Sequence, residues 1–116
     1  MMTERDSFRE RRFLAEAACG HLAFVEQAAQ RLDTGQATYG DSWQWIGVRR
    51  HLAELIEEAC DLGAWAVLCD QALDQEHGLD ADERERLRQT LRRVAALGAA
   101  AHRLLSDASE QLERPR

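Results

Sequence analysis

A heptad pattern through the middle of the chain constrains the fold more than any other feature of the sequence. Apolar or small residues recur there at alternating spacings of three and four without a slip. Such a seam is typical of a long helix that packs along another long helix. Its positions are Trp45, Val48, Leu52, Leu55, Ala59, Leu62, Ala66, Cys69 and Leu73.

The segments before and after this seam show the same helical period. Before it, Gly20 is the one residue between 6 and 33 that disfavours a helix, and the Thr34-Gly35 pair is a suitable end. The first segment repeats through Ala18, Leu22, Val25, Ala29 and Leu32, and the last through Leu87, Leu91, Val94, Gly98, Ala101, Leu105, Ala108 and Leu112.

Two capping boxes mark where the second and third helices begin. Asp41 with Gln44, and Asp80 with Glu83, have the spacing in which each side chain bonds the other residue's backbone N–H. Together with the periodicity, these signals predict helices over about 5–33, 42–77 and 81–113.

We therefore expect an all-α fold with one domain over 1–116. Short connections make consecutive helices antiparallel, so the predicted architecture is an antiparallel bundle of three long helices, completed by dimerisation. Glycine inside a helix costs stability unless packing requires it, so Gly63 and residues 98–101 predict close helix crossings.

Charge and hydropathy exclude several classes of protein. Fifteen basic residues, all of them arginine, stand against 21 acids and give a net charge of −6. Nonspecific nucleic-acid binding requires basic side chains that neutralise the backbone phosphates. We therefore do not expect this acidic chain to bind nucleic acid directly and nonspecifically. No apolar stretch is long enough to span a membrane, so we expect no membrane partner and a cytoplasmic protein.

The charges are unevenly distributed. No basic residue lies between Arg50 and Arg84, an interval that holds ten acids, whereas residues 84–103 contain six arginines and Glu85 as their one acid. One interpretation is electrostatic pairing of antiparallel helices. The other is an acidic cation site, with arginines nearby for an anionic substrate.

Three of these acids share a line of the second helix with large apolar residues. At about 100° per residue, Glu54, Glu58 and Asp61 align with Trp65 and Leu68. Because residues 62–69 are apolar on every side, we expect this region to be covered, and the adjacent carboxylates to be sheltered. Sheltered carboxylates protonate, pair with arginine or bind a cation. A site made only of oxygen ligands suits Mg²⁺ or Mn²⁺.

The stretch Glu57-Glu58-Ala59-Cys60-Asp61-Leu62, followed by an apolar run, resembles the ExxD half-motif of the MazG-like all-α nucleoside triphosphate pyrophosphohydrolases. Residues 39–43, YGDSW, are similar to a short motif of small phage-type proteins associated with that family. The resemblance implies that Glu58 and Asp61 hold magnesium, which orients the phosphates while water attacks the α-phosphorus and pyrophosphate leaves. Glu54 is added because it lies one turn earlier on the same line.

The other half-motif of that family, ExxE on the preceding helix, is missing, because Glu16 and Glu26 lie ten residues apart. Either a second subunit completes the site or catalysis has been lost.

The sequence leaves two functions open. The first is a metal-dependent phosphohydrolase acting on a nucleoside triphosphate, with phosphates neutralised by Arg50, Arg88 and Arg92. The second is a non-catalytic helical protein-interaction module, or a phage-borne inhibitor that acts through an acidic surface. Either would form a homodimer, with the second helices near the two-fold axis and an interface that includes Trp45, Trp65 and Leu68.

Overall fold

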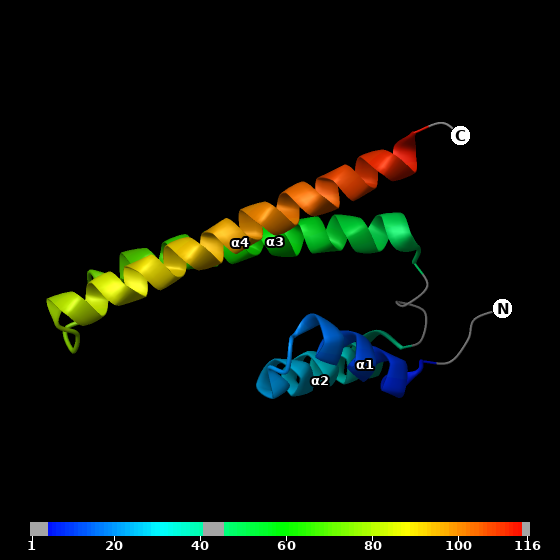
Figure 1. The fold of residues 1–116 in the computed structure, drawn as a ribbon, viewed down its shortest axis with the longest axis horizontal. Helices are drawn as coiled ribbons and strands as arrows, with labels where there is room; N and C mark the ends of the chain where they lie inside the picture. The colour runs from blue at the N-terminus through cyan, green and yellow to red at the C-terminus, as the bar shows by residue number, and fades with distance from the viewer. Residues whose placement is uncertain (1–4, 41–45, 115–116) are drawn as a thin grey trace. The chain divides into compact units, whose positions relative to one another are not determined.

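The computed structural model of the protein describes residues 5–40 and 46–114, and within them it contains four helices and no strand (Figure 1). The helices are α1 (Ser7–Ala17), α2 (Leu22–Tyr39), α3 (Val48–Leu73) and α4 (Ala81–Glu113). The all-α prediction is confirmed. The chain divides into two compact units, Met1–Gly47 and Val48–Arg116. Among the described helices, none has the length and apolarity to cross a membrane.

In place of one helix over 5–33, the first unit contains α1 and α2, which pack against each other. The break falls at Cys19 and Gly20, where φ is +50° and +86°. Glycine reaches this left-handed region without steric cost, so Gly20 lets the chain reverse direction. His21 then caps α2, because its Nδ1 accepts a hydrogen bond of 3.2 Å from the Phe24 N–H.

The second helix also runs beyond the predicted stop at Thr34-Gly35. The hydroxyls of Thr34 and Thr38 donate to the carbonyl oxygens of residues one turn earlier, at 3.0 and 2.9 Å, so both are satisfied inside the helix. α2 ends only at Gly40, which has a φ of +74°.

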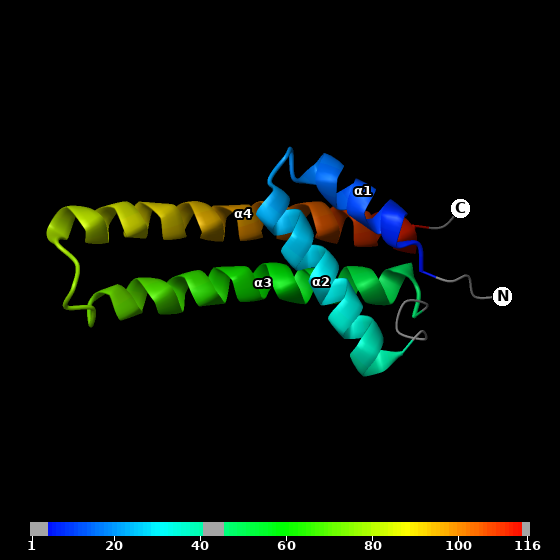
Figure 2. The same cartoon turned by 90° about the horizontal axis from the view of Figure 1, so that it is seen from below.

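The second unit is an antiparallel hairpin, in which α3 and α4 lie side by side in both views (Figures 1 and 2). The predicted start of α4 and the capping box of Asp80 with Glu83 are confirmed. α3 ends at Leu73, before the predicted 77, in a tightened turn where the Glu76 N–H donates to the Leu73 carbonyl oxygen. Arg84 stabilises this end, because its guanidinium donates to the carbonyl oxygens of Leu73 and Glu76 at 3.1 and 2.7 Å. The other predicted capping box, Asp41 with Gln44, lies outside the described residues.

The hairpin core is built mostly from small residues. Ala59, Ala66 and Leu73 are buried on α3, and Gly98 is buried on α4. A Cβ placed on Gly98 would lie 2.9 Å from the Ala59 carbonyl oxygen and 3.6 Å from the Gly63 nitrogen. The predicted close crossing is therefore confirmed at Gly98.

Candidate functional site

The three predicted metal ligands lie along α3, but the structure places their carboxylates in solvent. Glu54 forms an ion pair of 2.9 Å with Arg50, one turn away. The side chains of Glu58 and Asp61 are exposed, and neither forms an ion pair or hydrogen bond within the described residues. Nor does the described part of the chain hold a group of three or more acidic, histidine or cysteine side chains placed to bind a metal ion.

Within the α3–α4 unit, the hairpin itself does not provide the predicted shelter around these acids. Of the apolar run 62–69, only Ala66 is buried, whereas Trp65 is 69% exposed and Leu68 is 52% exposed. The physical reason lies in the hairpin, because α4 packs along one side of α3 and leaves the other sides of α3 open.

The three predicted phosphate-binding arginines do not form one cluster. Arg50 is occupied by Glu54. Arg88 crosses to the end of α3, where it pairs with Asp74 and, at 3.2 Å, with Asp70. Hydrogen bonding to Asp74 raises the pKa of Arg88 above its usual value, so the guanidinium stays charged while it links α4 to α3.

Arg92 lies one turn beyond Arg88 on α4, along a groove between α3 and α4 that also includes Val67, Asp70 and Leu91. Arg88 with Asp70, and Arg49 with Glu113, link the two antiparallel helices as the electrostatic interpretation predicts. Arg50 and Glu54, in contrast, pair within α3. Glu58, Asp61 and Arg92 remain unpaired in the described structure.

Large apolar side chains are exposed on one face of the hairpin, which we call the hairpin face. It comprises Leu55, Leu62 and Trp65 of α3, with Leu97 and Leu104 of α4, and Leu68 lies at its edge. Trp65, Leu97 and Leu104 are 69%, 66% and 71% exposed. An apolar surface of this kind on a folded protein marks a binding surface or an aggregation liability.

The opposite face has a different composition. A groove of about 570 Å³ runs there over Cys60, Gly63, Ala95 and Ala99, with His102, Arg103, Ser106 and Asp107 at one end. A residue two positions along a helix points about 160° away, which places Trp65 opposite Gly63 and Leu97 opposite Ala95 and Ala99. Trp65, Leu97 and Leu104 therefore share one face of the hairpin, whereas mostly small residues, together with the exposed Val67, lie on the other.

The heptad seam of α3 is partly buried and partly exposed. Ala59, Ala66 and Leu73, seven residues apart, are buried against α4. Two alternate positions of the seam, Leu55 and Leu62, are 50% and 41% exposed. α4 therefore covers only part of the seam, although the heptad pattern is typical of a seam that is packed at every position. Of the predicted interface residues, Trp65 and Leu68 are on or beside the hairpin face, and Trp45 lies outside the described residues.

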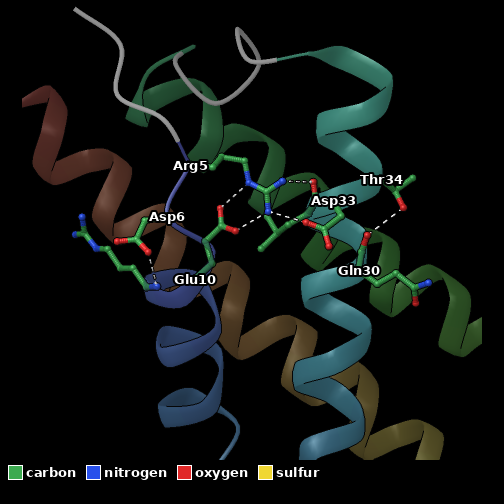
Figure 3. Close-up of polar contacts among 8 residues, drawn as sticks. Arg5, Asp6, Glu10, Gln30, Asp33 and Thr34 are labelled. Carbon is green, nitrogen blue, oxygen red and sulfur yellow. Dashed lines mark hydrogen bonds and ion pairs between the residues drawn. The ribbon is translucent and has the colours of Figure 1, made fainter.

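In the first unit, Arg5 joins α1 to α2 (Figure 3). Its guanidinium binds Glu10 at 2.6 and 3.0 Å, Asp33 at 3.0 Å and the Leu32 carbonyl oxygen at 3.5 Å. The hydrogen bond to Glu10 raises the pKa of Arg5 above its usual value. These ion pairs hold the two helices together, because α1 itself contributes no buried residue.

Sequence reasoning missed Arg5, Arg84, Leu97 and Leu104. The seven-residue spacing of Leu97 and Leu104 was a readable signal for a second apolar line on α4. The roles of Arg5 and Arg84 had no such signal, because each depends on a chain reversal that brings distant carbonyl and carboxylate oxygens to the guanidinium.

Comparisons of this chain with protein families, with curated proteins and with solved structures find no match.

Proposed function

We propose that this protein is a non-catalytic helical protein-interaction module, and that the hairpin face is its binding surface. The observation that carries the proposal is the exposure of Trp65, Leu97 and Leu104, each about two-thirds exposed or more on the same side of α3–α4. Amphipathic helix pairs use such faces to bind other helices, because burying these side chains on a partner removes apolar area from water.

Site-specific photo-crosslinking in cells that express the full chain tests this function. A photo-crosslinking amino acid replaces Leu97 on the hairpin face or, in the matched control, Val67, which is 55% exposed and borders a groove on the opposite side. Illumination should give discrete protein adducts from position 97 and few from position 67. Equal yields from the two positions, or no adduct from position 97, would contradict the proposal.

A second candidate function is a divalent-metal-dependent nucleoside triphosphate pyrophosphohydrolase. It is favoured by the unpaired, solvent-accessible carboxylates of Glu58 and Asp61 in the ExxD spacing, which leave oxygen ligands available to Mg²⁺ or Mn²⁺. Glu54 would join them by giving up Arg50, and acids from a second subunit would have to complete the site. In this proposal, phosphates would be neutralised by Arg50, Arg88 and Arg92.

Thermal unfolding with and without metal tests the second candidate. Millimolar Mg²⁺ or Mn²⁺ should raise the Tm of the full chain, because a ligand that binds only the folded state stabilises it. Glu58→Gln combined with Asp61→Asn should abolish the shift, whereas Glu57→Gln, an exposed acid on another side of α3, should preserve it. An unchanged Tm in the original chain, together with no pyrophosphate released from nucleoside triphosphates, would refute this candidate.

A further inference from the structure

We propose that the partner on the hairpin face is a second copy of this chain, and that two α3–α4 hairpins form a four-helix bundle. This inference rests on the proposed function, because it names the occupant of the same surface. Three observations carry it: the area left uncovered, the length of the hairpin, and the distribution of charge around the hairpin face.

The area that the hairpin leaves uncovered is apolar. On the hairpin face, Trp65, Leu97 and Leu104 are 69%, 66% and 71% exposed, and Leu55 and Leu62 are 50% and 41% exposed. Burial of an exposed leucine side chain removes apolar area from water, so a partner that covers this face gains stability from several side chains at once.

The length of the hairpin favours a partner of the same kind. α3 has 26 residues and α4 has 33, which at 1.5 Å per residue makes them about 39 and 50 Å long. The chain's own α1 and α2 have 11 and 18 residues, or about 17 and 27 Å, and are too short to run along the whole of α4. A second hairpin matches the full length, and two antiparallel hairpins are the parts of a four-helix bundle.

Charge around the hairpin face also suits a second copy. Glu58 and Asp61 follow the line of Trp65 on α3, and Arg86 and Arg93 precede Leu97 on α4 by about three turns and about one turn. None of these four charged side chains forms an ion pair within the described residues. A partner must therefore bring basic groups toward α3 and acidic groups toward α4. A second copy does so when its α4 lies over the first copy's α3.

Light scattering after size-exclusion chromatography of the full chain tests the inference. We expect twice the 13.2 kDa of one chain, falling toward a single chain on dilution. Leu97→Glu combined with Leu104→Glu should give 13.2 kDa at every concentration, because burying four carboxylates in the dimer is unfavourable. Val67→Glu, the control on the other face, should keep the dimer. All three positions are more than half exposed, so the hairpin should fold in each variant, as circular dichroism would verify.

Two results would overturn the inference. One is a single-chain mass for the original protein at all concentrations, and the other is a dimer that survives in the Leu97→Glu, Leu104→Glu variant. If Leu97→Glu with Leu104→Glu prevents folding, Leu97→Ala with Leu104→Ala serves instead, and weaker dimerisation is then expected.

The crosslinking experiment described above distinguishes failure of the second-copy inference from failure of the proposed function. Adducts from position 97 to a different protein, with a monomeric chain, would overturn the second copy and keep the interaction surface. An adduct to residues 7–39 of the same chain would overturn the second copy by showing that its own α1–α2 pair covers the hairpin face. A lack of adducts at position 97 would end both proposals.

Discussion

Replacing Gly98 by alanine should separate α3 from α4, because their crossing leaves no room for a side chain. The new Cβ would lie 2.9 Å from the Ala59 carbonyl oxygen and 3.6 Å from the Leu62 Cβ. The nearest of these atoms belongs to the backbone and cannot rotate away, so α4 has to move away from α3. Gly63→Ala is the matched control, since a Cβ on Gly63 would have no atom within 4 Å.

The magnitude follows from two opposing terms. Alanine in place of an interior helical glycine gains about 0.5–1 kcal/mol in both variants. Overpacking of a close contact costs about 1–3 kcal/mol, and this cost applies at Gly98 alone. We therefore expect Gly63→Ala to stabilise the protein by about 0.5–1 kcal/mol. Gly98→Ala should be about 1–3 kcal/mol less stable than Gly63→Ala.

Urea and thermal unfolding of the full chain, at one fixed protein concentration, measure this difference. A change of 1 kcal/mol moves the Tm of a domain of 60–100 residues by about 4–8 °C, so the two variants should be clearly resolved. The same concentration is needed because association alters apparent stability. If Gly98→Ala proves as stable as Gly63→Ala, the close crossing of α3 and α4 is wrong.

Two further predictions concern the polar ends of the helices. The backbone N–H of Glu83 lowers the pKa of Asp80, so the stability that Asp80 contributes is complete above its unfolded pKa of about 3.9 and is lost as the pH falls through its lower folded pKa. Asp80→Asn keeps a capping oxygen but does not titrate. Acid unfolding, monitored by circular dichroism, should therefore begin at a higher pH in the original chain than in the variant, in which only the other charges are lost. Arg5→Ala removes the links to Glu10 and Asp33, so hydrogen exchange should accelerate over 7–39 and stay unchanged over 81–113; equal acceleration in both ranges would contradict the division into two units.

The fold was predictable from the sequence wherever local signals agreed. α4 combines a capping box, an uninterrupted period and no interior proline, and its predicted bounds of 81–113 match the structure. The break at Cys19 and Gly20 was not predictable in the same way, because a lone glycine in a periodic segment fits either a tolerated helical residue or a chain reversal. The early end of α3 had no comparable local signal, and its hydrogen bond from Arg84 to the Leu73 carbonyl oxygen exists only after the hairpin has formed.

The candidate site was predictable in part, because periodicity identifies an apolar line without identifying what covers it. The acids, Trp65 and Leu68 do share one side of α3, but their exposure depends on how many helices surround α3. The sequence pattern cannot distinguish α3 with one partner helix from α3 inside a four-helix bundle, since both use the same residues. The alignment of Glu58, Asp61 and Trp65 is therefore found in α3, whereas the hairpin alone does not supply the expected shelter.

The two proposed functions therefore depend on the hairpin face in different ways. In the hairpin by itself, the carboxylates of Glu58 and Asp61 are exposed to water, which screens their charge and makes a cation unnecessary. A second hairpin packed over Trp65 would remove water beside them, and the cost of an unpaired carboxylate would then require a cation or a guanidinium. Association through the hairpin face is thus sufficient for an interaction module, whereas a metal site needs that association first and oxygen ligands from the partner as well.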